Sequence, residues 1–353
     1  MSLLKINYIS LSLILIYSFL SPLNAQSNSE SSENNLEASD IWPKSLDAKY
    51  YNETWNYYFD FNDGTKLFIE FSVSEFGRFK SAVSGARISL HGFDETGNVY
   101  RVSREYPIED LEMDQDEFKL NLNPRQDNIW FKGKLPEEHH LHIDTGKDGV
   151  RFDIDLSLHN IQHGEIVNGG VFMVAADSVG IITHIPFAEV TGQITMNQKK
   201  RVVKGTAQMD RVYMSNKITD ILHAGYRFAS LQDPSNWLSV ILLQPNSMSQ
   251  NMIGYILRRE EGQISTEIVK SATVHESTQS VSAITITSMN NNYELINNSI
   301  IERYGIFSEL SWLARRAARI ALGGELIIFR GDATFSGTDI DGSDGYYNFF
   351  LID

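Results

Sequence analysis

The chain has 353 residues, of which 42% are hydrophobic and 11% aromatic, enough for about two domains with sizeable cores. Its formal net charge of −15 argues against a nucleic-acid-binding protein, because such proteins need a basic surface to neutralise phosphates. The chain contains no cysteine, which excludes disulfide bonds and thiolate chemistry.

The N-terminal segment has the pattern of a secretory signal. Lys5 precedes an apolar run over residues 8–20, which is typical of the core of a signal peptide and short for a membrane span. Ala25 would end this segment, so we expect residues 1–25 to be a signal peptide and the mature protein to be periplasmic or secreted, without a membrane span. Residues 26–41 are rich in Ser, Asn and Glu, which predicts a disordered linker.

The first predicted domain covers residues 42–204 and opens with a β-hairpin. Apolar residues alternate with polar ones over 55–61 and 67–73, and Asn62-Asp63-Gly64 between the two runs is a strong turn signal. Short alternating runs without a convincing helix indicate an antiparallel sandwich or barrel. Further strands are expected near 86–93, 100–106, 117–122, 128–132, 140–143 and 150–158.

A second hairpin is expected around residues 186–215. Val190, Ile194 and Met196 alternate before a polar turn at 197–200, and the alternation resumes after it. The second strand runs into Met209-Asp210-Arg211-Val212-Tyr213, so an acid, a base and a phenol gather near a strand end. This is where the sequence concentrates groups able to do chemistry.

The same stretch carries a family resemblance. Its pattern is Pro-Phe-Ala-x-Val-x-Gly-x-Ile from Pro186, followed by Val-x-Gly-x-Ala-x-Met-Asp-x-x-Tyr ending at Tyr213. The pattern resembles the domain junction of the AttH/hydroxyneurosporene-synthase group of lipocalin-like proteins, which includes carotenoid 1,2-hydratases, fungal decalin-forming Diels–Alderases and survival-factor-type proteins. The Trp-x-Tyr-x-Phe opening at Trp55, followed by Asp-Gly-x-x-Leu, is similar to the start of that group.

The resemblance implies a pair of lipocalin-like barrels and an isoprenoid, polyene or lipid ligand. Members usually carry Asp-His followed by Trp-Gly at the junction, whereas here Asp210 is kept, Arg211 stands in place of His, and Tyr213 stands about where Trp would be. In the hydratases the acid is thought to serve proton transfer to an alkene, which needs a carboxyl group with a raised pKa. An arginine beside Asp210 would instead keep that carboxyl group ionised.

The second predicted domain covers residues 205–353. A helix is expected between Ser308, as its N-cap, and Leu322, with Gly323-Gly324 ending it. Its residues Leu310, Leu313, Ala317 and Ile320 share one face, and Arg315, Arg316 and Arg319 lie on the other, which we expect to face solvent. Strands are expected near 222–228, 237–243, 252–258, 264–269, 281–287, 293–296, 326–329 and 346–351.

These elements predict an all-β fold of two tandem lipocalin-like antiparallel β-barrels or half-barrels, with one α-helix in the C-terminal half. Barrels of about eight strands can enclose a small ligand, and the aliphatic and aromatic inward faces favour a hydrophobic one. We therefore predict Asp210 and Tyr213 as catalytic groups. The predicted ligand-binding residues are His184, Arg211, His223, Tyr226, Arg227 and Trp237. The alternative is that Asp210 forms a structural ion pair with Arg211 or Arg227 at the domain junction.

Metal and cofactor sites find little support. His140 and His142 would share one face of a strand without a carboxylate at obvious ligand spacing, so we expect a surface strand and no metal. Dinucleotide-binding, P-loop and zinc-protease motifs are missing, so no cofactor is expected. Two functions remain open: a monomeric carrier of a lipid or isoprenoid, or a hydratase or cyclase without a redox cofactor.

Overall fold

The computed structural model describes residues 36–44, 48–75, 77, 81–123, 125–174, 177–246, 251–277, 280–308 and 310–353. The expected signal peptide and most of the expected linker lie outside these residues. The last part of the linker segment, however, forms a 3-10 helix, η1 (Ala38–Ile41), whose Ile41 is buried. The carbonyl oxygen of Ile41 accepts a 2.9 Å hydrogen bond from the Trp55 indole, and this bond together with the buried Ile41 side chain fixes the segment to the first strand.

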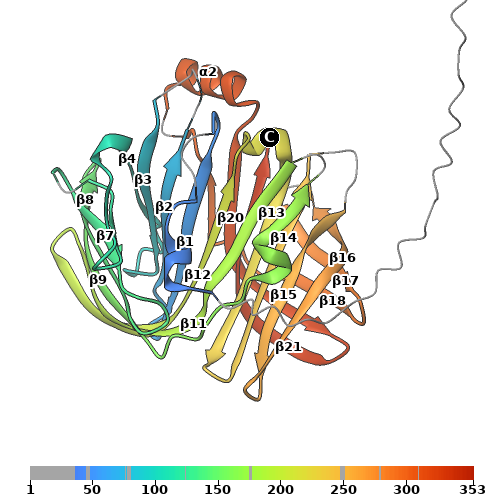
Figure 1. The fold of residues 1–353 in the computed structure, drawn as a ribbon. Helices are drawn as coiled ribbons and strands as arrows, with labels where there is room; N and C mark the ends of the chain where they lie inside the picture. The colour runs from blue at the N-terminus through green and yellow to red at the C-terminus, as the bar shows by residue number, and fades with distance from the viewer. Residues whose placement is uncertain are drawn as a thin grey trace, which may run out of the picture. The chain divides into compact units, whose positions relative to one another are not determined.

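The first half of the chain forms one antiparallel sheet of twelve strands (Figure 1). Its path is β4-β3-β2-β1-β12-β11-β9-β8-β7-β6-β5, and β10 pairs with β11 beside it. The sheet curves around a core of aromatic and aliphatic side chains, and β4 and β5 are its two ends. Its strands are β1 (Asn52–Phe61), β2 (Lys66–Ser74), β3 (Val83–His91), β4 (Tyr100–Pro107), β5 (Glu112–Asp114), β6 (Lys119–Asn121), β7 (Asn128–Lys132), β8 (His139–Lys147), β9 (Val150–His159), β10 (Val171–Val174), β11 (Asp177–Met196) and β12 (Lys199–Met214). Short 3-10 helices, η2 (Ile108–Asp110) and η3 (Val167–Gly170), lie between strands.

The expected second hairpin is confirmed as β11 and β12, the longest strand pair of this sheet. Its turn consists of Asn197 and Gln198, with φ values of 46° and 73°. Positive φ at both central residues is the geometry that matches the twist of antiparallel strands. The hairpin carries the chain from the core of the first sheet to the region where the second sheet begins.

The second half forms a closed antiparallel barrel. Eight strands, β13-β14-β15-β16-β17-β18-β20-β21, follow one another, and pairing of β18 with β20 closes the ring while β19 pairs with β20 outside it. The fold class is therefore confirmed as mostly β, with the first sheet a half-barrel and the second a full barrel. The strands are β13 (Leu222–Asp233), β14 (Asn236–Pro245), β15 (Met252–Glu260), β16 (Gln263–Ser277), β17 (Ser280–Ser288), β18 (Asn292–Asn297), β19 (Glu302–Gly305), β20 (Leu326–Gly337) and β21 (Ile340–Ile352).

The chain passes from the first sheet to the second between Met214 and Leu222, where a single helical turn, α1 (Ile218–Ile221), connects β12 to β13. The expected boundary after residue 204 lies within β12. The division into independent domains stays a prediction.

The half-barrel and the barrel pack against each other through their outer faces. One apolar cluster joins Val212 and Met214 of β12 to Trp237 and Leu243 of β14. At another place Tyr58 of β1 stacks on Tyr346 of β21, with ring centroids 4.5 Å apart. Val212, Met214 and Leu243 of the first contact also line a cavity between the half-barrel and the barrel, which is the candidate site.

A buried carboxylate strengthens the same interface. Glu302 of β19 accepts hydrogen bonds from Ser89 of β3 at 2.9 and 3.0 Å and forms ion pairs with Arg101 of β4 and Arg330 of β20. His91 of β3 lies 3.2 Å from the same carboxylate. Burial alone would raise the pKa of Glu302, but Arg330, His91 and Arg101 together lower it well below its usual range.

The expected C-terminal helix is confirmed as α2 (Trp312–Leu322), ending at Gly323, whose φ is 81°. Its N-cap is Ser311 and not Ser308. Arg316 faces solvent as expected, whereas the partly exposed Arg315 and Arg319 also pair with Glu325 and Asp353, each at 2.8 Å. Leu313 and Ile320 of the expected apolar face are instead exposed. Because Glu325 is fully buried, its carboxylate requires cationic partners, and this requirement turns the helix.

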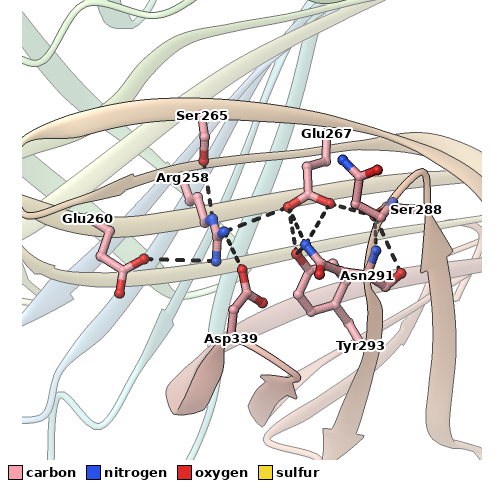
Figure 2. Close-up of polar contacts among 9 residues, drawn as sticks. Arg258, Glu260, Ser265, Glu267, Ser288, Asn291, Tyr293 and Asp339 are labelled. Atoms are coloured by element: carbon pink, nitrogen blue, oxygen red, sulfur yellow. Dashed lines mark hydrogen bonds and ion pairs between the residues drawn. The ribbon is translucent and has the colours of Figure 1, made fainter.

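A polar network connects residues beside the β15–β16, β17–β18 and β20–β21 turns at one end of the barrel (Figure 2). The Tyr293 hydroxyl donates to Glu267 at 2.5 Å, and Ser288 donates to the same carboxylate at 2.5 Å. Arg258 lies between Glu267 and Asp339 and is paired with both. Buried aliphatic and aromatic side chains form an apolar core within the barrel.

Candidate functional site

The candidate site is a cavity of about 540 Å³ between the half-barrel and the barrel. One wall is formed by the outer faces of β1 to β4, and the other by β13, β20, β21 and helix α2. Ligand cavities of about this size are common in proteins that bind small molecules. The sequence had led us to expect a ligand inside the barrels, whereas the structure places this cavity between them.

The wall from the first sheet is polar because of strand alternation. In β1 the side chains of Trp55 and Tyr57 enter the core, so the residues that alternate with them, such as Asn56, face the cavity. Asn52 donates a 2.7 Å hydrogen bond to Ser74 on this face. The polar lining comprises Asn52, Thr54, Asn56, Glu70, Ser72, Ser74, Glu75, Arg87, Ser103, Arg104 and Glu105.

The opposite wall is mainly apolar. Helix α2 and the residues before it contribute Leu310, Ala314, Ala318 and Leu322, which recur every four residues and therefore lie along one side. The apolar lining continues with Ile306, Phe307, Leu326, Ile328 and Phe350. Phe350 can lie against β13 because position 225 is glycine: a Cβ there would be 2.3 Å from the Phe350 ring.

Asp210 and Arg227 form the main ion pair at the cavity wall. Asp210 Oδ2 lies 3.1 Å from Arg227 Nε, and Asn56 Nδ2 donates to Asp210 Oδ1 at 2.9 Å. Asn56 and Arg227 line the cavity, and the buried Asp210 lies directly behind them. Burial raises the pKa of Asp210, while Arg227 and the Asn56 hydrogen bond lower it; the net shift is upward. The carboxyl group is thus easier to protonate than an exposed aspartate.

Two predicted site residues of β12 lie on the opposite face from Asp210. Arg211 is fully buried in the first sheet, where Nε lies 2.7 Å from Glu53 Oε1. The half-buried ring of Tyr213 follows on the same face and covers Gly180, where a Cβ would be 2.0 Å from Tyr213 Cζ. Period-2 alternation therefore separates Arg211 and Tyr213 from the cavity. Of the two arginines considered as partners of Asp210, the structure selects Arg227.

The remaining predicted site residues also lie away from the cavity lining. His184 is buried, and burial together with the charge of Arg211 lowers its pKa well below the usual range. Tyr226 points into the barrel, stacks on Tyr347 at 5.5 Å and donates a hydrogen bond to Asn297. Trp237 packs in the apolar cluster between the sheets, and His223 lies half-buried at the start of β13.

Sequence reasoning missed most of the polar lining. Glu70 and Arg87 form a 2.8 Å ion pair on this wall, and Arg104 pairs with Asp127 at 3.0 Å. The signal available was the run of polar residues alternating with core residues in β1 and β2. That pattern is the same whether the polar face meets water or a cavity.

The histidine tract of β8 divides between two faces. His139 is buried and 2.8 Å from the Tyr57 hydroxyl, and burial lowers its pKa to about 3. His140 and His142 each contact Asp155, at 3.2 and 3.3 Å. Within the part of the chain that the structure describes, no group of three or more His, Asp or Glu side chains is arranged to hold a metal ion. Among the same residues, no helix is long and apolar enough to cross a membrane.

Comparison with known proteins identifies the fold. No family model matches the sequence, and no curated protein matches it. An AttH-type protein from Nitrosomonas europaea superimposes with a TM-score of 0.62 at 14% identity, covering 90% of this chain and 97% of that one. CghA in complex with Sch210972 gives 0.59 at 11% identity, covering 86% and 89%. Kievitone hydratase from Nectria haematococca gives 0.56 at 12%, covering 92% and 94%. The resemblance to AttH-like lipocalin-like proteins is thereby confirmed for the fold.

Proposed function

We propose that this protein binds an amphipathic small molecule, with a lipid-like or isoprenoid skeleton and at least one oxygen-bearing polar group, in the cavity between its two sheets. The observation that carries the proposal is the contrast between the cavity walls. Side chains of β1 to β4 offer amides, hydroxyls and charged groups, whereas α2 and its surroundings offer aliphatic and aromatic surface. A wholly apolar ligand would leave the polar wall without hydrogen-bond partners.

The polar wall favours a ligand with hydroxyl or carbonyl groups over one with a strong charge. Arg87, Arg104 and Arg227 each already have a carboxylate partner, at 2.8, 3.0 and 3.1 Å. Glu70, the partner of Arg87, lies on the same wall, so opposite charges compensate within the lining. Asn52, Asn56 and the serines remain as neutral donors and acceptors for a ligand's oxygen atoms.

A second candidate function, proton transfer to the bound ligand, is supported by Asp210. Its carboxyl group is buried behind the cavity wall with a raised pKa, which is what a general acid requires. Kievitone hydratase, one of the structural neighbours, is by its name a hydratase. On this proposal the Asp210 carboxyl group, reached by a small shift of Asn56 or Arg227, would give its proton to one carbon of a ligand double bond. A water molecule would bond to the other carbon, and the proton that this water loses would return to Asp210.

A pair of matched substitutions on α2 tests the binding proposal. Ala314→Trp places an indole at the cavity wall, and Ala317→Trp places the same side chain about one helical turn later, at an exposed position outside the cavity lining. We expect the affinity for a fluorescent fatty-acid probe to fall about 10-fold in the first variant, about 1.4 kcal/mol, because the indole occupies space that the probe needs, and to stay unchanged in the second. Equal affinities in both variants would place the ligand elsewhere.

Proton transfer has a separate test. Asp210→Asn removes the acid at nearly constant volume, and turnover of a polyene or hydroxylated aromatic substrate should fall about 100-fold while probe binding is retained. If the wild type binds the probe but turns over none of these substrates, only the carrier function is left.

We also propose that the protein is exported and acts as a monomer outside the cytoplasm. The apolar run at residues 8–20 behind Lys5 supports export. N-terminal sequencing of the mature protein should then begin near Gln26. Recovery of intact Met1 from the soluble fraction contradicts the proposal.

A further inference from the structure

Helix α2 has an apolar outer side as well as an apolar inner side. Trp312, Leu313 and Ile320 are 69%, 71% and 75% exposed, although all three belong to residue types that usually lie inside. The inner side of the same helix, with Ala318 and Leu322, lines the cavity. Single exposed apolar residues are ordinary, but three on one short helix form a patch.

The orientation that exposes this patch is fixed by ion pairs. Arg315 contacts the fully buried Glu325 at 2.8 Å, and Arg319 contacts Asp353 at 2.8 Å. Rotating the helix to bury Leu313 and Ile320 would remove the cations from Glu325, which costs several kcal/mol for a buried charge. The apolar side therefore stays outside in the folded protein.

The apolar surface is continuous from the outer side of α2 into the cavity. Leu310 and Ala314 are exposed to solvent and also line the cavity, so they lie at its mouth between the outer patch and the inner wall. Leu310 and Ala314 offer a lipid-like molecule an apolar path from the patch to the cavity. This continuity links the patch to the source of the ligand.

We propose that the outer side of α2 docks on the surface of a phospholipid bilayer and brings the cavity mouth to the lipid. This inference rests on the proposed function, because it assumes a lipid-like ligand. Tryptophan and aliphatic side chains with adjacent arginine are typical of helices that lie in the headgroup region. Arg316 lies against Trp312, 5.8 Å from its ring centroid, and among the described residues no carboxylate competes with a lipid phosphate for its charge.

Charge further restricts the kind of bilayer. The chain carries a net charge of −15, which repels strongly anionic membranes, while α2 itself contributes three arginines and no acidic residue. Docking should thus depend on apolar insertion and local phosphate contact more than on long-range attraction. We expect binding to zwitterionic vesicles and only a small gain when anionic lipid is added.

The test is co-flotation of the full mature chain with phosphatidylcholine vesicles. A triple variant, Trp312→Gln, Leu313→Gln and Ile320→Gln, keeps helix propensity and removes the patch. A matched control changes three exposed apolar residues elsewhere, Met173→Gln, Val202→Gln and Met289→Gln, which are 64%, 83% and 67% exposed. We expect the vesicle-bound fraction to fall about 10-fold or more in the patch variant and to stay at the wild-type value in the control.

The outcomes separate docking from ligand binding. The patch variant should still bind the soluble fatty-acid probe with wild-type affinity, because none of its three residues lines the cavity. Unchanged flotation of that variant, or no flotation of the wild type, overturns the docking proposal and leaves the cavity function intact. A concentration-dependent dimer that the patch variant abolishes, without vesicle binding, would assign the patch to a second copy of the chain and also overturn it.

Discussion

Asp210 on the half-barrel and Arg227 on the barrel are held 3.1 Å apart at the wall of the cavity between the two sheets. Both outcomes weighed from the sequence, a functional acid and a structural ion pair at the junction, are compatible with this geometry. The pair joins the last strand of the first sheet to the first strand of the second. Any ligand that contacts Arg227 would therefore act on both sheets.

The Asp210–Arg227 pair predicts a pH-dependent loss of stability. In Arg227→Met the cation that lowers the pKa of Asp210 is gone, so burial raises that pKa further. A carboxyl group whose pKa is higher in the folded state than in the unfolded state costs stability as the pH rises through the folded pKa. The variant should lose about 2 kcal/mol at pH 7.5 and less at pH 4.5, measured by urea unfolding. Arg227→Lys, which keeps the charge, should lose less at both values.

Glu302 predicts the opposite dependence. Its pKa is lowered in the folded protein, so the stability it confers is present above the ordinary carboxylate pKa and is lost as acid protonates the folded protein. Glu302→Gln should cost about 3 kcal/mol near neutral pH, because Arg330 is left buried without its partner. Its free energy of unfolding should also depend less on pH in the acid range than that of the wild type. Glu294→Gln on β18, at an exposed position, serves as the control. Equal losses at pH 3 and pH 7 would contradict this role.

Substitutions of Tyr226 should lower the stability of the barrel without changing ligand binding in the cavity. Its ring is buried in the barrel against Tyr347, and its hydroxyl donates to Asn297. Tyr226→Ala should cost about 3 kcal/mol or more through the space left in the core, whereas Tyr226→Phe should cost about 1 kcal/mol. Calorimetry measures both values. In the folded fraction, affinity for the fatty-acid probe should match the wild type; a selective loss of affinity would extend the site into the barrel.

Gly180 and Tyr213 predict a coupled pair. A Cβ at position 180 would be 2.0 Å from Tyr213 Cζ, so Gly180→Ala must displace the ring. We expect a loss of about 1–3 kcal/mol, as for other overpacked sites. In the double variant with Tyr213→Ala, the two losses should be less than additive, because the clash disappears. Additive losses would show that the ring moves aside at no cost.

Most of the fold could be predicted from the sequence, because strand alternation and turn residues act locally. The β11–β12 hairpin is predictable from the alternating apolar residues on both sides of Asn197, and the end of helix α2 is predictable from Gly323. The closure of the second sheet but not the first could not be predicted. It depends on the pairing of β13 with β21, the first and last strands of the second half of the chain, and no local pattern specifies a pairing between such distant segments.

The site was predictable only in part, for a physical reason. The sequence indicated Asp210 and Arg227, but it also grouped Arg211 and Tyr213 with them because they are close in sequence. In the strand, alternation places Asp210 on one face and Arg211 and Tyr213 on the other. The orientation of α2 was missed for a related reason. Its arginines meet Glu325 and Asp353, which follow the helix in sequence, and the need of a buried carboxylate for cations outweighed the apolar pattern.

The short end strand β5 has a consequence for how copies of this protein meet. An unpaired strand edge is a template on which another chain can add a strand, the first step of aggregation. Glu112, Met113 and Asp114 of β5 are all exposed, and Asp116 and Glu117 follow in the turn. A second copy approaching edge to edge would bring its own carboxylates against these, and like charges on adjacent strands repel. The acidic edge thus disfavours extension of the half-barrel's sheet from β5 into a neighbouring copy, a protection that the barrel obtains from its closure.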